Sequence, residues 1–279
     1  MRGRFAAGAL ALATVTIAPA EARTNVGRQV WTAVEVTAPI ADDVFLTAQI
    51  QPRFTSDNAA TAPITFIPPV VSWRKSDSLV LSTGYLYAYI DGKQLARGFA
   101  EHRFFQQASY RITTIGRVGI RAQTRIEERQ RTLGEDWNLR VAQTLLVATP
   151  LTKKESGGPV GVISTELYWN MTEADWGARK GYDDLWSFIG VQMPLSESSA
   201  VEFGYLNQRQ RAVNGVANMN HAAVLNFSFQ LLGKIRPPEI VPTVGLGIQP
   251  IGRRNPTVVK EGKKPKPRTE PDGTGIKRD

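Results

Sequence analysis

Candidate catalytic side chains are few in this sequence. The chain has no cysteine, and its two histidines are His102 and His221. A Ser–His hydrolase requires a serine hydroxyl within reach of the imidazole. The nearest serines, Ser109 and Ser228, fall on the opposite side of the same extended segments, because successive strand residues point to opposite faces. We therefore expect no catalytic residue, although a lipid-modifying enzyme that uses the two histidines stays open as an alternative.

Metal and cofactor sites are not indicated either. Two histidines on separate segments, without clustered carboxylates, are weak grounds for a zinc site. Asp175, Asp183 and Asp184 are too few for a calcium loop built on alternating aspartates, and no glycine-rich phosphate loop opens a helix. We expect no metal site, no cofactor and no enzymatic activity.

A larger set of charged side chains does form a pattern. Seven arginines and five glutamates, with no lysine among them, fall on the polar side of alternating segments. Arginine carries a permanent charge and a planar set of donors that can pair with a carboxylate through two hydrogen bonds. The residues expected to line a common interior, or lumen, are Glu35, Arg53, Glu101, Arg103, Arg111, Arg117, Arg121, Arg125, Glu127, Arg140, Glu166 and Glu202.

The elements that carry these charges read as β-strands with one polar and one apolar face. In residues 117–129 every second residue is polar or glycine, and the residues between them are mostly apolar. Residues 44–54, 162–171 and 220–231 repeat this period of two. Such alternation is the pattern of a strand with different environments on its two sides.

Ten turn signals rich in Pro, Gly, Asp and Ser divide residues 27–231 into eleven candidate strands of about nine to fourteen residues. That length suits a tilted membrane strand and exceeds the roughly five or six residues usual in soluble sheets. Aromatic residues near the strand ends are typical of an interfacial girdle. These aromatic residues are Trp73, Tyr89, Tyr110, Trp137, Trp169, Trp176, Trp186 and Phe229. We therefore predict an all-β protein, an antiparallel transmembrane β-barrel of about ten to twelve strands.

The strand count raises a question of parity. Bacterial barrels normally have an even number of strands. Either residues 27–37 are not a membrane strand, or a twelfth strand lies in residues 239–251, where Pro242 and Pro250 disfavour a central strand.

Both ends of the chain differ from this central region. Arg2 and Arg4 precede an apolar run, and Ala20-Glu21-Ala22 fits a cleavage site, so residues 1–22 are expected to be a signal peptide. We assign residues 23–232 to the barrel, 233–252 to a post-barrel segment with room for one further strand, and 253–279 to a disordered tail rich in Lys and Pro. That tail holds nine Lys/Arg against four Asp/Glu and carries most of the net charge of +9. Nucleic acid is therefore not an expected partner of this exported chain.

The order of several motifs resembles a proteobacterial family known as domain of unknown function 2490, a family of outer-membrane β-barrels. The resemblance covers about residues 27–229, and the motifs are loose individually but specific in order and spacing. Its matching pieces are Trp31 before a Pro39 turn, Gly84-Tyr85, Glu101-His102-Arg103, the run 121–129, Trp137-Asn138-Leu139-Arg140, Glu166-Leu167-Tyr168, Gly204-Tyr205-Leu206 and Asn220-His221. Two features depart from the family pattern: residues 183–186 lack an arginine, and about fifty residues follow the last strand. The resemblance implies the fold and an outer-membrane location, and it implies no activity.

Two kinds of barrel interior are compatible with the charged set. The charges can form an ion-pair network that plugs the lumen, or they can line a narrow water-filled pore whose excess arginine favours anionic solutes. We therefore expect an integral outer-membrane protein, either a narrow porin-like channel or a structural envelope protein. Its expected partners are outer-membrane lipid and lipopolysaccharide and a small solute, with the basic tail near the cell wall or anionic lipid. A soluble periplasmic β-protein is the remaining alternative.

Overall fold

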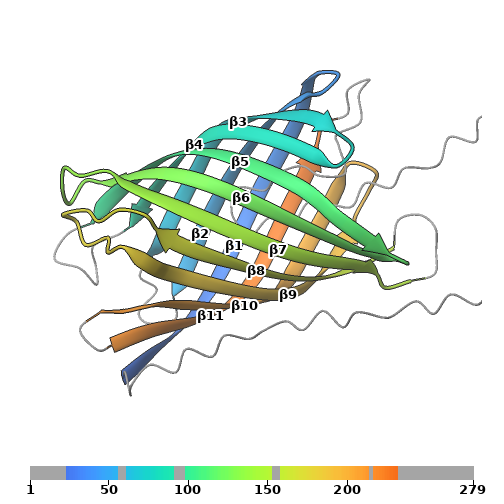
Figure 1. Cartoon of the computed structure of the whole chain (residues 1–279). Helices are drawn as coiled ribbons and strands as arrows, with labels where there is room; N and C mark the ends of the chain where they lie inside the picture. The colour runs from blue at the N-terminus through green and yellow to red at the C-terminus, as the bar shows by residue number, and fades with distance from the viewer. Residues whose placement is uncertain (1–22, 56–60, 91–97, 153–157, 214–215, 232–279) are drawn as a thin grey trace, which may run out of the picture.

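The protein folds as a closed barrel of eleven β-strands (Figure 1). The computed structural model describes residues 23–55, 61–90, 98–152, 158–213 and 216–231, and this part of the chain contains no helix. The predicted all-β barrel and its eleven segments are thus confirmed. The strands are β1 (Arg23–Ala41), β2 (Val44–Thr55), β3 (Thr61–Ser76), β4 (Leu79–Ile90), β5 (Phe99–Ile115), β6 (Val118–Arg131), β7 (Asn138–Pro150), β8 (Val160–Asn170), β9 (Gly181–Pro194), β10 (Ser199–Val213) and β11 (Val216–Gln230).

The prediction of an antiparallel barrel is wrong for one pair of strands, because the barrel closes through a parallel pair. Each strand is antiparallel to its neighbours in sequence, but β1 runs parallel to β11, with Arg23 opposite Val216 and Thr37 opposite Gln230. An odd number of strands in alternating directions leaves the first and last strands pointing the same way, so their pairing has to be parallel. The two solutions offered for the parity question are therefore unnecessary: β1 includes residues 27–37 and belongs to the barrel, and residues 239–251 lie outside the described residues.

The two ends of the barrel differ, and we name them by their connections. At the turn end, residues 42–43, 77–78 and 116–117 form two-residue turns, and Gly116 supplies the positive φ of 59° that the last of them requires. At the loop end, longer connections follow β6 (residues 132–137) and β8 (residues 171–180). In Figure 1 the loop end lies on the left and the turn end on the right. Strand β1 begins at the loop end and β11 ends at the turn end, which is a direct consequence of the odd count.

Large apolar side chains cover the outer face of the barrel. Ten of the eleven strands, all except β7, expose at least one large apolar side chain outward, and on β7 the outward Leu139, Val141, Leu145 and Val147 are half-buried. Representative outward residues from β1 to β11 are Val30, Val34, Ile50, Val71, Leu81, Phe104, Ile126, Ile163, Leu167, Ile189, Phe203 and Leu225.

The predicted aromatic girdle needs two corrections. Trp73, Trp137 and Trp169 are exposed on the outer side. Trp176 and Trp186 are instead buried, because Trp176 packs over arginines at the loop end and Trp186 points into the barrel. A tryptophan near a strand end can cap an interior as well as anchor at an interface, and sequence position alone does not separate the two.

The interior has three zones between the two ends. Along β9 the inward residues change from Asp184 near the loop end, to Trp186 and Phe188, and then to Gln192 near the turn end, all buried. The middle zone is a packed apolar cluster whose side chains are almost inaccessible, with exposures of 1% for Trp31, 2% for Phe188 and 0% for Leu206. Strand β5 follows the same order with Glu101, Phe105, Gln107 and Ser109.

No helix in the described ranges is long and apolar enough to cross a membrane. The signal peptide (1–22), the post-barrel segment from residue 233 and the tail (253–279) lie outside the described residues, so these assignments stay predictions.

Candidate functional site

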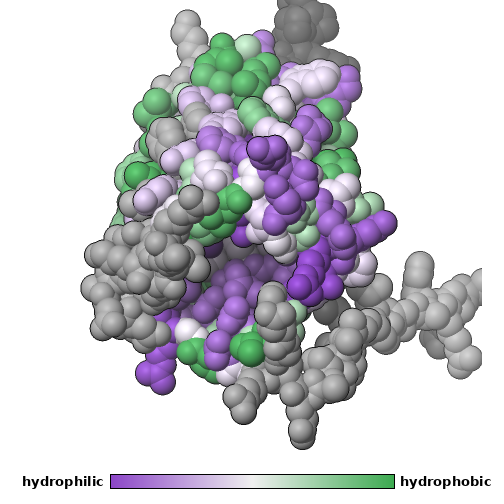
Figure 2. Space-filling view, turned by 90° about the vertical axis from the view of Figure 1, so that its left-hand side faces the viewer, coloured by the Kyte–Doolittle hydropathy of each residue, from purple (hydrophilic) through white to green (hydrophobic). Residues whose placement is uncertain are grey.

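The loop-end half of the interior encloses a cavity of about 400 Å³, which we call the arginine cavity. Figure 2 views the barrel from this end and shows hydrophilic residues deep in its hollow. Eight arginines, contributed by strands β2, β5, β6, β7 and β10 and by the β8–β9 loop, line the cavity, against three acidic residues. The arginines are Arg53, Arg103, Arg125, Arg129, Arg131, Arg140, Arg179 and Arg211, and the acidic residues are Glu101, Asp183 and Asp184.

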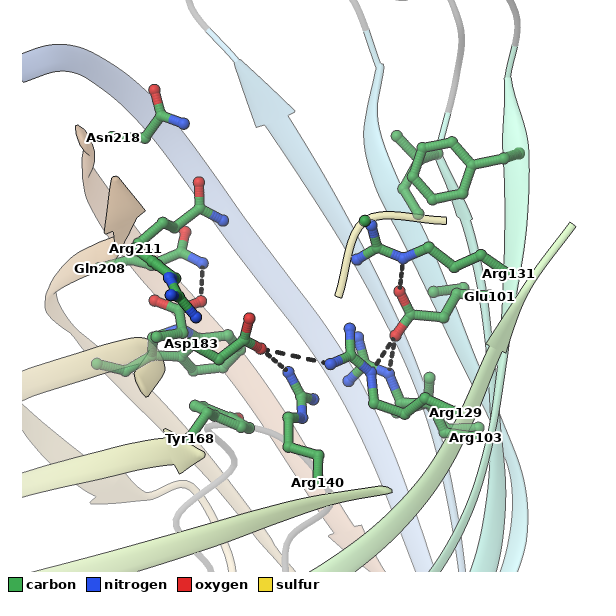
Figure 3. A pocket seen from close by; sticks show the side chains of 18 of the residues that line it. Glu101, Arg103, Arg129, Arg131, Arg140, Tyr168, Asp183, Gln208, Arg211 and Asn218 are labelled. Atoms are coloured by element: carbon green, nitrogen blue, oxygen red, sulfur yellow. Dashed lines mark hydrogen bonds and ion pairs between the residues drawn. The ribbon is translucent and has the colours of Figure 1, made fainter. Parts of the chain in front are cut away.

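Glu101 is the centre of the first ion-pair group (Figure 3). Its carboxylate is 1% exposed and accepts from three guanidinium groups. Arg129 Nε lies 2.9 Å from Oε1, Arg131 Nε lies 2.5 Å from Oε2, and Arg103 Nε also donates to Oε1. The register of β5 and β6 explains the meeting, because Glu101 is paired with Arg131 and Arg103 with Arg129. One carboxylate therefore organises three arginines and leaves a local excess of positive charge.

Glu127 holds a second group deeper in the wall. Its two oxygens accept from Arg125 Nε at 2.8 Å and from Arg140 Nε at 2.7 Å. Arg125 Nη2 also reaches Glu166 Oε1 at 3.0 Å. All four side chains are buried, and each charge has an opposite charge in contact, as buried ions require.

Asp183 connects the two groups from the opposite wall. Its Oδ2 lies 3.0 Å from Arg140 Nη1 and 3.3 Å from Arg129 Nη1. The register between β8 and β9 shifts at this point: Tyr168 pairs with Asp184 and Trp169 with Tyr182, so Asp183 is an extra residue. A bulge of this kind redirects a side chain, and it allows Asp183 and Asp184 both to line the cavity although they are adjacent in sequence.

Arg53 lies on the aromatic floor of the cavity, which we define as Trp31, Tyr168, Trp186 and Phe188. Its guanidinium carbon lies 3.7 Å from the ring centre of Trp31 and 5.2 Å from that of Trp186. Nε and Nη2 donate to Gln51 Oε1 at 3.1 and 2.8 Å. Trp186 in turn packs edge-on against Trp31, with ring centres 5.1 Å apart. Arg53 is thus held by π faces and an amide, which support a cation without neutralising it.

The β8–β9 loop folds over the cavity mouth. The Asp175 carboxylate accepts from the backbone N–H groups of Glu135 (2.9 Å) and Asp136 (3.2 Å), and Asp136 Oδ2 accepts from Asp175 N at 3.0 Å. Trp176 donates from Nε1 to the Asp136 carbonyl at 2.8 Å, and its ring lies 4.6 Å from the Arg131 guanidinium carbon. The backbone donors lower the pKa of Asp175 below its ordinary value. These bonds tie the loops after β6 and β8 together.

Seven of the twelve charged residues expected in the lumen lie at or behind the arginine cavity. Arg53, Glu101, Arg103, Arg125 and Arg140 line it. Glu127 and Glu166 pair with the arginines of its wall.

The other five lie elsewhere. Glu35 and Glu202 are buried in the turn-end half, where Asn226 donates to Glu202 at 3.0 Å. Arg111 and Arg121 face each other across β5 and β6 and are half-buried. Arg117 belongs to the β5–β6 turn, is exposed, and donates to the Thr152 carbonyl outside the interior. The alternating pattern extended one residue too far there, because the turn begins at Gly116.

Both histidines lie on the outer side of the barrel. His102 Nδ1 is 2.6 Å from the Tyr85 hydroxyl, and His221 Nδ1 is 2.5 Å from that of Tyr205. The two pairs share one geometry. His102 lies opposite Tyr87, two residues after Tyr85, and His221 lies opposite Asn207, two residues after Tyr205. Their contacts are thus with tyrosine hydroxyls and not with the serines considered in the sequence. Within the described ranges, no cluster of three or more His, Cys, Asp or Glu is arranged to hold a metal ion.

Several cavity residues were missing from the predicted set. Arg129 lies within the alternating run of residues 117–129 and Arg131 continues it, so both were detectable from the alternation of β6. Asp183 was not detectable in that way, because the bulge breaks the period of two. Arg179 lies in a loop and Arg211 near the loop end of β10, so no strand pattern placed them.

We expect Glu101→Gln to destabilise the barrel by about 3–5 kcal/mol, because it removes the charge on which three buried or half-buried arginines converge. The free energy of unfolding, measured by urea titration of the protein refolded in lipid vesicles, checks this value. Glu128→Gln is the matched control, since Glu128 is exposed on the outer face of β6 and a surface change costs within about 0.5 kcal/mol. Equal, small effects of both variants would contradict a shared ion-pair role for Glu101.

We expect acid to loosen the two connected loops. Because the folded loop lowers the pKa of Asp175, its contribution is fully present above the unfolded Asp value of about 3.9 and is lost as the pH falls through the folded value. The amide proton shifts of Glu135 and Asp136, followed by NMR, should change with a midpoint below about 3.9. A midpoint at or above that value would show that the carboxylate is not held by these donors. Asp175→Ala should produce the loosened loop at neutral pH.

Comparison with known proteins identifies the family of the chain. A family described as "Protein of unknown function (DUF2490)" matches residues 28–220. An uncharacterized protein of Methylorubrum extorquens is 33% identical over 198 residues, which cover 71% of this chain and 85% of that protein. The matched region contains the whole arginine cavity and its floor. The chain therefore belongs to the DUF2490 family, whose function is unknown.

Proposed function

We propose that the protein is an integral β-barrel of the bacterial outer membrane whose interior is closed to solutes. The observation that carries the proposal is the outer face, on which ten of eleven strands expose large apolar side chains. Monomeric soluble proteins rarely expose a contiguous apolar patch larger than a few hundred Å². An apolar surface that encircles the molecule is stable in lipid and would aggregate in water.

The distribution of outer polar groups supports a membrane band. Arg28, Glu128 and Arg209 are exposed on the outer face toward the loop end, and Lys75 is exposed near the turn end. Between them, the outward Thr124 hydroxyl donates to Gln143 at 2.6 Å, so that these two polar groups satisfy each other. The strands have 11 to 19 residues, and about 9–11 tilted residues are needed to cross a bilayer.

The proposed orientation rests on the three two-residue turns at the turn end and on the longer β6–β7 and β8–β9 connections at the loop end; the connections β7–β8 (residues 151–159, turn end) and β10–β11 (residues 214–215, loop end) are exceptions. In outer-membrane barrels the short turns face the periplasm and the longer loops face outward. The arginine cavity then opens to the exterior. Because β11 ends at the turn end, the chain after Gln230 starts on the periplasmic side, where a basic tail would meet the cell wall or anionic lipid.

A closed interior is better supported than the porin-like alternative. A water-filled pore needs accessible side chains along its whole length, whereas the middle zone of this barrel is packed with apolar side chains that are 0–7% exposed. The residues that line the arginine cavity come from the loop-end half and end at Tyr168 and Trp186 of the floor. Five of the eight arginines of the cavity, Arg103, Arg125, Arg129, Arg131 and Arg140, form ion pairs with carboxylates, and these pairs support a structural role for that part of the set.

Cell fractionation and bilayer recording test the two parts of the proposal. We expect the protein in the outer-membrane fraction, with a gel mobility that changes on heating, and no steady unitary conductance after reconstitution. The double variant Trp186→Ala/Phe188→Ala removes half of the floor and should conduct, whereas Leu185→Ala/Ile189→Ala, on the outward face of the same strand, should not. Recovery in the soluble fraction would refute the membrane location, and unitary conductance of the unaltered protein would refute the closed interior.

A further inference from the structure

We propose that the arginine cavity is a binding site for a small organic anion, with its carboxylate or phosphate on the arginine wall and its apolar part on the opposite wall. The inference goes beyond the proposed function, because a closed outer-membrane barrel needs no ligand. It concerns the loop-end cavity alone and does not depend on conductance.

The charge of the cavity is the first argument. Eight arginines line it against three acidic residues, and including Glu127 and Glu166 from the wall behind still leaves three arginines in excess. An interior that served stability alone would match its buried charges, because unmatched ones are costly to desolvate. The excess positive charge is what an anion would neutralise.

The partners of individual arginines locate that excess. Arg53 contacts Gln51 and two tryptophan rings, all of them neutral. Arg211 donates from Nη1 to the carbonyls of Arg179 and Lys180, at 3.2 and 2.8 Å. Arg125, which donates from Nε and Nη2 to carboxylates, keeps a third donor nitrogen: its Nη1 is buried and has no hydrogen-bond partner among the described residues. Guanidinium donors without an acceptor beside a cavity are suited to bind carboxylate or phosphate oxygens.

The apolar wall opposite the arginines indicates that the ligand also has an apolar part. Leu86, Ala88, Ile90 and Phe99, from β4 and β5, line the cavity on an apolar side. Trp186 and Tyr168 close its floor, with ring centres 5.0 Å apart. A hydrated inorganic ion has no apolar surface to bury against such a wall, whereas an aryl or alkyl group would bury apolar surface there. A volume of about 400 Å³ accommodates a single small molecule.

The entrance supports exchange with the exterior. The cavity opens at the loop end (Figure 2). Gly177 and Arg179 of the connected β8–β9 loop belong to its lining. The loop is held by backbone-to-carboxylate bonds and by Trp176 over Arg129 and Arg131. A ligand carboxylate or phosphate that reached the rim arginines would meet positive charge from the mouth to the floor.

Isothermal titration calorimetry with phenyl phosphate tests the proposal on the full-length mature protein, folded in detergent micelles. We expect saturable binding of phenyl phosphate, weaker binding of inorganic phosphate, and no binding of phenol. Equal affinity for the two phosphates would overturn the apolar half of the proposal. Absence of saturable phosphate binding would overturn all of it.

Two variants separate the cavity from the surface. Arg53→Gln removes a charge that contacts no carboxylate, so it leaves no carboxylate unpaired, and it should weaken phenyl phosphate binding at least about tenfold. Arg209→Gln is the matched control, because Arg209 is exposed on the outer face at the same end of the barrel, and its affinity should be unchanged. Heat-modifiable mobility verifies that each variant is folded. Unchanged binding by folded Arg53→Gln, or equal losses in both variants, would overturn the assignment to the cavity; neither result bears on fractionation or conductance.

Discussion

The fold depends on the pairing of buried charges inside a closed sheet. The inward side chains fill the middle of the eleven-stranded barrel, where those of the apolar cluster are almost inaccessible. The buried carboxylates Glu101 and Glu127 each accept from two or more arginines, and Asp183 joins the two groups across the interior. A buried carboxylate without such partners would be costly. The network therefore fixes how β5, β6, β7 and β9 face one another at the loop end.

The zones of the interior follow from that constraint. Charges gather where the cavity opens to solvent, and the apolar cluster around Trp31, Phe188 and Leu206 fills the middle, where no solvent reaches. Arg53 lies at the boundary, with its charge toward the cavity and its planar face on Trp31. The same sheet presents apolar residues on its outer face. Its strands therefore contribute to three environments, which are the apolar outer face, the apolar middle zone and the polar interior at the ends. This arrangement explains how the barrel can carry a pocket that is open at one end without a continuous channel.

Much of the fold could be predicted from the sequence, because alternation is a local property. The period of two gave the barrel class, and the turn residues gave eleven segments. Parallel closure would have followed from eleven segments in one closed barrel, but no local signal in the sequence shows that the first strand pairs with the last. The apolar middle zone of the interior could not be predicted either. The sequence alone does not show whether apolar residues such as Trp186 and Phe188 lie on the outer face or in a packed core. Within the site, Glu101 and Arg125 followed from alternation, whereas Asp183 depended on a bulge and Arg179 on a loop.

The central claim is that the cavity is open at the loop end and blocked at the aromatic floor. Because the chain has no cysteine, single cysteines can be placed on either side of that floor. Gln210→Cys lies in the cavity and Gln192→Cys lies toward the turn end. A membrane-impermeant maleimide, added only from the loop side of the reconstituted barrel, should label Gln210→Cys and leave Gln192→Cys unlabelled, although both react after unfolding. Rapid labelling of Gln192→Cys from the loop side would contradict the account.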